Sequence, residues 1–81
     1  MKLDEHTLAQ RWGLKIAELR SDQNISQVDL AAAAGTTQQT ISRIERGEQV
    51  PSDGMRVRLA RALDVYVTEL FRYDDHEEVE R

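Results

Sequence analysis

The stretch that decides the fold is SQVDLAAAAGTTQQTISRIERG, residues 26–47. The hydroxyl of Ser26 can accept a hydrogen bond from the amide of Asp29, whose carboxylate can reach back, and this pattern is a capping box at a helix start. Four alanines follow shortly afterwards, and Gly35 is then the residue most able to take the left-handed conformation that ends a helix. The pattern predicts a short helix over residues 26–34.

A second short helix is predicted only a few residues further on. Thr37 is a candidate N-cap, and Ile41 and Ile44 have the spacing of one inward face. Gly47 supplies a second stop signal, so we predict a helix over residues 37–46. Two short helices joined by a turn of about three or four residues form a helix-turn-helix unit.

The flanking segments also carry helical patterns. From residue 7 to residue 20, apolar side chains recur at the spacing of one helical face: Leu8, Trp12, Ile16 and Leu19. Because Trp12 keeps step with the others, we expect it to anchor the core rather than to form a binding platform. Ser52 is a candidate N-cap for a fourth helix, and residues 65–71 can add a short fifth one. With no alternating strand pattern, the sequence predicts an all-α fold, a compact five-helix domain over residues 8–72.

The formal net charge of −4, taken alone, argues against a polyanionic partner. The charge is unevenly placed, because residues 74–81 hold five acids and one base, whereas residues 1–73 hold ten of each. A terminal acidic run with one aliphatic residue cannot bury enough surface to offset its ordering entropy. We therefore expect residues 73–81 to form an acidic, solvated tail, and the partner of the domain must be judged without it.

Composition excludes several other classes of protein. The sequence has no cysteine, which removes disulfides and zinc fingers. His6 and His76 are too far apart to suggest a metal site, and no histidine converges with carboxylates on one predicted helix face. We predict no metal, no cofactor and no enzymatic activity. No apolar segment suits a signal peptide or a membrane span, so we expect a cytoplasmic protein that joins the nucleoid when bound to DNA.

Polar side chains gather at the start of the second predicted helix of the unit: Gln38, Gln39, Thr40 and, one turn later, Arg43. Glutamine can bond adenine at N6 and N7, arginine can bond guanine at O6 and N7, and a threonine methyl suits the thymine methyl. A solvated polar face without a binding role is the alternative. Because the first turn of this helix enters the major groove in helix-turn-helix proteins, we expect double-stranded DNA as the partner.

Several spaced elements of the sequence point to one family: Ser26-Gln27, Leu30-Ala31, Gly35, residues 37–47, Pro51-Ser52 and residues 59–63. Together they resemble the Cro and phage-repressor class of helix-turn-helix regulators, also called the xenobiotic-response-element (XRE) family. The resemblance implies a five-helix domain that regulates transcription and binds a two-fold related operator as a homodimer. The segment GTTQQ, residues 35–39, is similar to the part of lambdoid phage repressors that reads A·T pairs with glutamines.

The resemblance also implies roles for single residues. Gln38 and Gln39 fall on the principal base-reading positions, and Arg43 falls on a deeper reading position. The candidate phosphate contacts are Gln27, Thr37, Arg46 and Gln49, and Arg56 is added to them for its position near the start of the fourth predicted helix. The alternative for Arg56 is a place on a solvated helix face. Without Arg56, the base-reading and phosphate-contacting residues form a DNA-facing surface that holds two bases, Arg43 and Arg46, and no acid.

Arg20 and Glu45 match a pair that the phage repressors place beneath the recognition helix. An arginine-carboxylate fork can lock two helices together in a partly dry site, and two independent surface charges are the alternative. The sequence departs from the family at three positions, where the family has an aliphatic residue, a glycine and a capping serine: Thr36, Asp64 and Tyr66. The last two departures leave the geometry after residue 63 open.

The phage-repressor dimer uses the start of its fifth helix, so the candidate interface residues are Val67, Leu70 and Phe71. For Leu70 and Phe71, sealing the core is the alternative role. The leading hypothesis is a dimeric repressor that reads an inverted-repeat operator through the major groove. The alternative hypothesis is an antitoxin-type or partner-controlled module that regulates its own gene and binds another protein through its C-terminal part, including the acidic tail.

Overall fold

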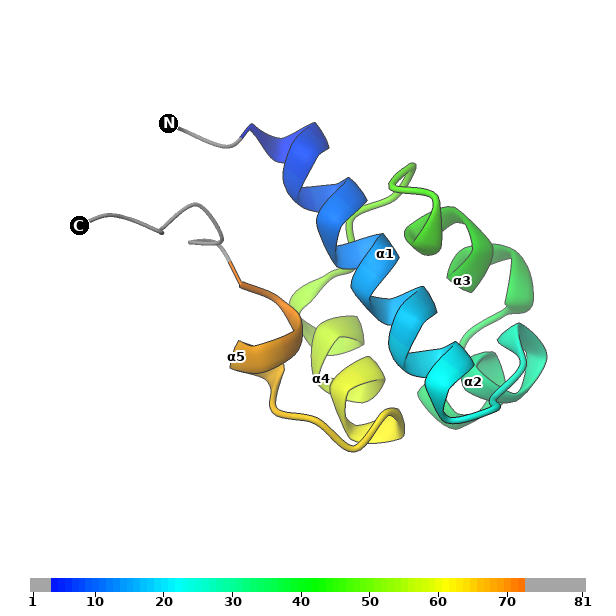
Figure 1. The fold of residues 1–81 in the computed structure, drawn as a ribbon. Helices are drawn as coiled ribbons and strands as arrows, with labels where there is room; N and C mark the ends of the chain where they lie inside the picture. The colour runs from blue at the N-terminus through cyan, green and yellow to red at the C-terminus, as the bar shows by residue number, and fades with distance from the viewer. Residues whose placement is uncertain (1–3, 73–81) are drawn as a thin grey trace.

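The computed structural model describes residues 4–72, and this part of the chain is built from five α-helices without a strand (Figure 1). The helices are α1 (Glu5–Asp22), α2 (Gln27–Ala34), α3 (Gln38–Glu45), α4 (Asp53–Ala62) and α5 (Val67–Leu70). The all-α, five-helix architecture predicted from the sequence is confirmed. The acidic tail predicted at residues 73–81 lies outside the described residues.

The first four helices begin in the same way, with a side-chain oxygen that accepts a hydrogen bond from the amide three residues later. The caps are Asp4, Ser26, Thr37 and Ser52, with distances of 2.8, 3.0, 3.1 and 3.2 Å. The sequence predicted the last three. Because Asp4 also caps, α1 begins at Glu5, ahead of the predicted helix start at residue 7 and the predicted domain boundary at residue 8.

The same four helices also end alike. A residue in the left-handed conformation follows each one, and the next amide donates to the carbonyl five residues back, as in a Schellman motif. The left-handed residues are Asn24, Gly35, Gly47 and Asp64, with φ of 57°, 68°, 75° and 59°. Asp64, at a position where the resemblance led us to expect glycine, therefore adopts the left-handed conformation that glycine favours. Because this turn takes up Val65 and Tyr66, α5 is shorter than the predicted segment 65–71.

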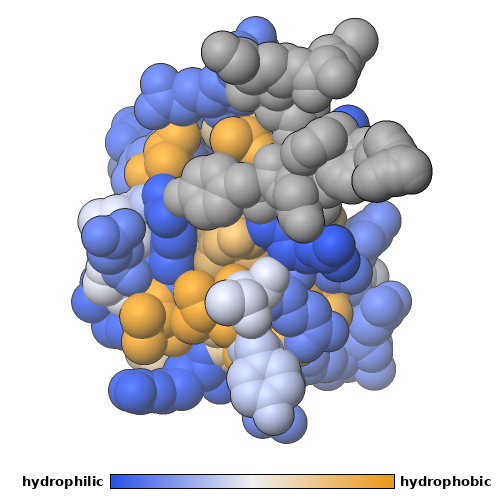
Figure 2. All heavy atoms as spheres, turned by 90° about the vertical axis from the view of Figure 1, so that its left-hand side faces the viewer, coloured by the Kyte–Doolittle hydropathy of each residue, from blue (hydrophilic) through white to orange (hydrophobic). Residues whose placement is uncertain are grey.

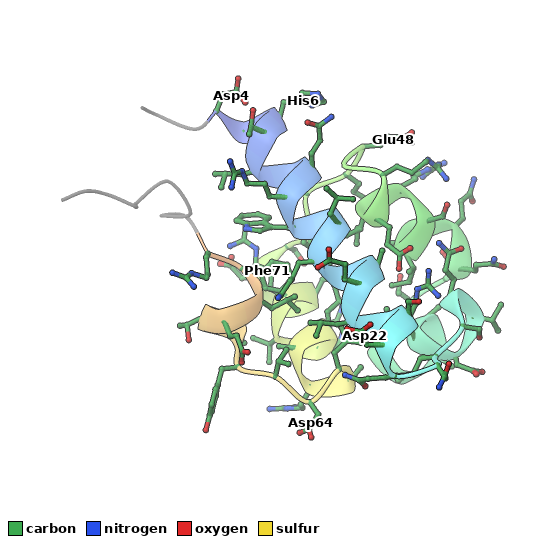
Figure 3. The ribbon with its side chains drawn as sticks, viewed as in Figure 1. Asp4, His6, Asp22, Glu48, Asp64 and Phe71 are labelled. Carbon is green, nitrogen blue, oxygen red and sulfur yellow. The ribbon has the colours of Figure 1, made fainter. Side chains whose placement is uncertain are left out.

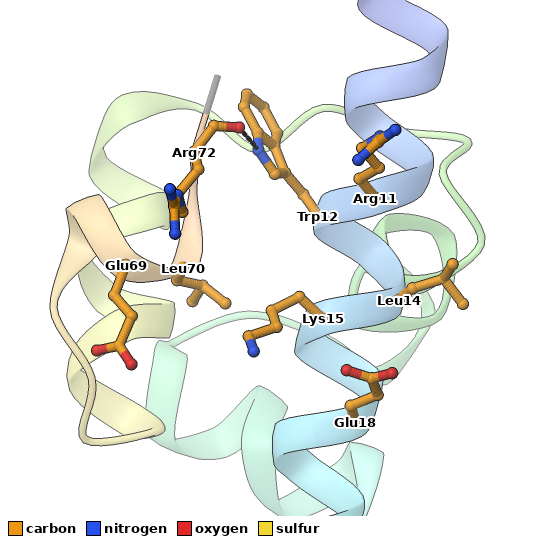
Figure 4. Close-up of a pocket in the computed structure, with 8 residues that line it drawn as sticks. All are labelled: Arg11, Trp12, Leu14, Lys15, Glu18, Glu69, Leu70 and Arg72. Atoms are coloured by element: carbon orange, nitrogen blue, oxygen red, sulfur yellow. Dashed lines mark hydrogen bonds between the residues drawn. The ribbon is translucent and has the colours of Figure 1, made fainter. Parts of the chain in front are cut away.

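The core lies where α1 crosses the other helices (Figure 1). Helix α1 packs on α3 and α5, while α2 packs on α3 and α4. The largest fully buried side chains are Ile16, Leu30, Ile41, Ile44, Leu59, Leu63 and Leu70. Trp12 meets Phe71 edge to face with 5.4 Å between ring centroids. The indole Nε1 of Trp12 donates to the carbonyl of Arg72 at 2.9 Å (Figure 4). Trp12 thus anchors the core, as predicted.

Candidate nucleic-acid interface

The start of α3 presents polar side chains to solvent. Gln38, Gln39 and Arg43 are exposed, and on the opposite side of the helix Ile41 and Ile44 are buried. This division follows from helical geometry, which places residues three apart on one face. The three long side chains proposed to read bases therefore share the outer part of one short helix.

Thr40, the fourth candidate base-reading residue, is placed differently. It is half-buried, and its amide and its hydroxyl both contact the hydroxyl of the cap Thr37, at 3.1 and 3.0 Å. The two threonines therefore cap the first turn of α3, and Thr40 is less accessible than the neighbouring glutamines.

Arg20 and Glu45 form the predicted fork between α1 and α3. Arg20 Nε donates to Glu45 Oε2 at 2.7 Å and Nη2 donates to Oε1 at 3.1 Å, while Nη1 donates to the carbonyl of Ile25 at 3.0 Å. The carboxylate raises the pKa of Arg20, mainly through these hydrogen bonds. The Glu45 side chain is 8% exposed, so it turns inward and is not an independent surface charge.

Gln27 lies between this fork and Gln38 at the exposed start of α3. Its Nε2 donates to Glu45 Oε1 at 2.9 Å, and its Oε1 accepts a longer hydrogen bond from Gln38 Nε2 at 3.4 Å. Gln27 was expected to contact a phosphate. The structure adds that Gln27 bridges both ends of α3 from the first position of α2.

Arg46 is exposed just after α3, where the candidate phosphate contact was expected, but an acid lies beside it. Its Nε and Nη2 donate to the two oxygens of Glu48 at 2.9 and 3.1 Å, and Nη1 donates to the hydroxyl of Ser42. The hydrogen bonds from Arg46 lower the pKa of Glu48. The expectation that this surface holds no acid is therefore wrong, because the carboxylate of Glu48, which is labelled in Figure 3, accepts hydrogen bonds from the guanidinium of Arg46. Gln49, the next residue, is half-buried.

Arg56 was a further phosphate candidate, and the structure gives it other contacts. Its guanidinium carbon lies 4.8 Å from the centroid of the Trp12 ring and 5.9 Å from that of Phe71. Its Nε donates to the carbonyl of Pro51 at 3.2 Å, and Nη1 lies 3.6 Å from Asp53. These contacts hold Arg56 against the core, and we leave it out of the proposed DNA contacts.

The three candidate interface residues do not share one environment. Leu70 and Phe71 are 2% and 4% exposed, so in a single chain they seal the core, which is the alternative role expected for them from the sequence. Val67 is half-buried, and beside it Tyr66 is 79% exposed. Figure 2, which looks onto the side of the molecule where α5 lies, shows apolar surface broken up by hydrophilic side chains.

One residue that positions α3 was missed by the sequence reasoning. A Cβ atom on Gly13 would lie 2.5 Å from the carbonyl oxygen of Glu45 and closer still to that of Ile44. The backbone of α1 therefore lies directly against the last turn of α3. The available signal was a glycine inside a strong helical pattern, which costs about 1 kcal/mol relative to alanine and so often marks close packing.

Within residues 4–72, no group of three or more potential metal ligands comes together. His6 is exposed near the start of α1 (Figure 3), and His76 lies outside the described residues. None of the described helices is long and apolar enough to cross a membrane.

Comparison with known proteins agrees with this geometry. The helix-turn-helix family profile matches residues 16–70. The uncharacterized HTH-type transcriptional regulator MJ0272 of Methanocaldococcus jannaschii is 35% identical over 63 residues, which cover 78% of this chain and 96% of that protein. The crystal structure of the restriction-modification controller protein C.AhdI from Aeromonas hydrophila superposes with a TM-score of 0.75 at 33% identity, covering 78% of this chain and 96% of that one.

A chain in the structure of the SinR protein/SinI protein complex also superposes. Its TM-score is 0.72 at 32% identity, and the match covers 84% of this chain and 66% of that one. The profile match spans more than half of the sequence and includes both helices of the predicted unit. The chain therefore belongs to the XRE-type helix-turn-helix family of DNA-binding transcriptional regulators.

Proposed function

We propose that this protein is a dimeric repressor that binds an inverted-repeat operator by inserting α3 into the major groove. The observation that carries the proposal is the exposed pair Gln38 and Gln39 in the first turn of α3, directly after the N-cap Thr37. In the major groove, the side-chain amide of a glutamine can donate to N7 of adenine and accept from its N6 amino group. Arg43, one turn later, is suited to guanine.

The residues around this pair fit contacts to the DNA backbone. The proposed phosphate contacts are Gln27, Thr37, Arg46 and Gln49, which lie at the N-termini of α2 and α3 and in the loop after α3. Phosphate contacts set the register of the protein on DNA, whereas the glutamines set its sequence preference. Changes in the two groups should therefore have different effects on binding.

The dimer would place two recognition helices about 34 Å apart, one turn of DNA, and would occlude a promoter. Val67 at the start of α5 remains the surface candidate for the contact between copies, with exposed Tyr66 next to it. Leu70 and Phe71 would support that contact from the core.

The test is selection of bound sequences from a random pool of double-stranded DNA. We expect an inverted repeat with A·T pairs at the positions read by Gln38 and Gln39. A direct repeat would contradict the proposed symmetry of the dimer. Failure to enrich any sequence, or binding that does not respond to salt, would contradict the DNA-reading role itself.

A second candidate function is control by a protein partner, and one feature of the surface favours it. A groove of about 430 Å³ lies between α1 and α5, with Trp12 and Leu70 in its wall and basic and acidic side chains around them (Figure 4). Leu14, on the same groove, is 63% exposed. Co-expression with the product of a neighbouring gene, followed by gel filtration of the wild type and of a chain lacking residues 74–81, tests for a partner that needs the tail.

A further inference from the structure

A chain of hydrogen bonds connects the C-terminal end of α3 with the exposed side chain at its N-terminal end. It runs from Arg20 to Glu45, from Glu45 to Gln27 and from Gln27 to Gln38. Glu45 is the last residue of α3 and Gln38 is the first, so the chain closes a loop through the start of α2. It begins at Arg20 and Glu45, whose side chains are 21% and 8% exposed, and ends at Gln38, which lies in solvent.

The chemistry of each group fixes the orientation of the next one. A carboxylate paired with arginine only accepts hydrogen bonds, so the atom of Gln27 that faces Glu45 has to be the donor Nε2. The other end of the same amide is then Oε1, which only accepts. Gln38 consequently has to meet Gln27 with its own Nε2.

This orientation decides what Gln38 offers to DNA. Its Oε1 is left to accept from the N6 amino group of adenine, and the second hydrogen of Nε2 is left to donate to N7. A reversed amide would contact Gln27 through Oε1 and would present the wrong polarity to adenine. Gln39, the adjacent base-reading candidate, takes no part in the chain.

We propose that Glu45 is a positioning residue that sets the hydrogen-bonding polarity of the Gln38 amide, through Gln27, and thereby determines the adenine preference at the base pair that Gln38 reads. This inference rests on the proposed function. It assigns Glu45 a part in sequence preference in addition to its fork with Arg20.

The direct test is the Glu45→Gln substitution, because the introduced amide can donate to Oε1 of Gln27 and allow both glutamines to reverse. In selection from a random DNA pool, we expect the preference for adenine at the Gln38 position to fall about threefold or more, the share of one hydrogen bond. The preference at the Gln39 position should not change. A merely structural role of Glu45 would weaken both positions together.

A second variant removes the chain without touching the fork. Gln27→Met keeps Arg20 and Glu45 together, so it is expected to fold, and it should lower the adenine preference at the Gln38 position as well. Any phosphate contact that Gln27 also makes would be lost equally for all sequences. The ratio between the Gln38 and Gln39 positions therefore isolates the positioning effect.

The free protein gives an independent readout, the side-chain amide resonances of the glutamines in ¹⁵N NMR spectra. Glu45→Gln should shift the resonances of Gln27 and Gln38 and leave those of Gln39 in place. Unshifted Gln38 resonances would overturn the hydrogen-bond chain. If the wild type enriches a DNA site and both variants keep its base preferences, the proposed role of Glu45 is wrong. If the wild type enriches none, the proposed function fails, and this base-reading role with it.

Discussion

Two arginine-glutamate forks of nearly the same geometry lie at the end of the recognition helix. In the inner fork, Arg20 and Glu45, the two hydrogen bonds measure 2.7 and 3.1 Å, and in the outer fork, Arg46 and Glu48, they measure 2.9 and 3.1 Å. The inner partners are 25 residues apart and 21% and 8% exposed, whereas the outer partners are two residues apart and both 55% exposed. Distances alone therefore do not reveal what a fork does.

The difference follows from solvent and from chain topology. In the inner fork, water cannot fully replace a lost partner, and the two residues belong to α1 and α3, so the pair fixes one helix on the other. In the outer fork, water competes for both charges, and the partners are already neighbours in one loop. We infer that the inner fork stabilises the fold. In the outer fork, Glu48 engages the guanidinium of Arg46, which would otherwise be available to a DNA phosphate.

The largest predicted effect comes from separating the helices that the inner fork joins. In Gly13→Ala, the new methyl group would collide with backbone oxygens of Ile44 and Glu45, which cannot move aside as a side chain can. We expect a loss of at least about 2 kcal/mol in the free energy of unfolding. Urea unfolding followed by circular dichroism measures it.

Gly54→Ala is the matched control for the Gly13→Ala substitution. A Cβ atom at Gly54 would meet only the flexible Arg58 guanidinium, at 3.3 Å, and alanine is the better helix former. We expect this variant to be as stable as the wild type or slightly more stable. If Gly13→Ala matched it, α1 would not be in close contact with the last turn of α3.

The second prediction compares the two arginines directly. Arg20→Met leaves Glu45 without its partner in a site that is 8% exposed, so the free energy of unfolding should fall by about 2 kcal/mol, less than for a fully buried pair. Arg46→Met should not change the melting temperature measurably, because its partner is solvated. Equal melting temperatures of the two variants would remove the distinction between the forks.

The sequence predicted the parts of this molecule that depend on local chemistry. The caps Ser26, Thr37 and Ser52 and the turns at Gly35 and Gly47 follow from residues within one helical turn of each other. The inner fork is a contact between distant segments, and only the family resemblance pointed to it. Local chemistry also permits caps and turns that were not predicted, at Asp4, Asn24 and Asp64.

What could not be predicted was decided by packing or by side-chain rotamers. Position 13 requires glycine because the backbone of α3, 31 residues away in the sequence, lies against it, and no local sequence pattern contains that contact. Glu48 adjoins the expected DNA surface in sequence, but an exposed arginine has many rotamers, and only the three-dimensional arrangement selects the fork. The base-reading and phosphate-binding roles themselves remain proposals.

The third prediction concerns DNA binding. Glu48→Gln removes the charge that occupies Arg46, so affinity for the selected operator should rise while the melting temperature stays the same. The slope of log affinity against log salt should become more negative by up to about 1, the share of one added phosphate contact. Fluorescence anisotropy at several salt concentrations measures both.

Any lost acid also makes the protein less repulsive to DNA in general, and Asp22→Asn controls for that. Asp22 is an exposed acid at the end of α1, away from Glu48 (Figure 3). It should change affinity less than Glu48→Gln and leave the salt slope unaltered. Equal gains in the two variants would mean that net charge, and not the release of Arg46, is responsible.

The smallest predicted effect is the titration of the outer fork. Hydrogen bonds from Arg46, followed by the charges of Arg46 and Arg43, hold the pKa of Glu48 below its ordinary value of 4.5. Because the pKa is lower in the folded state, ionised Glu48 adds a stabilisation above about pH 4.5 that is too small for the melting temperature of Arg46→Met to show, and this contribution disappears as the pH falls through the lowered value. The carboxyl resonance of Glu48 in a ¹³C NMR titration should have its midpoint below 4.5, and Arg46→Met should move it upward. An unchanged midpoint would mean that the outer fork does not persist in solution, and Arg46 would then be available to phosphate without any exchange of partners.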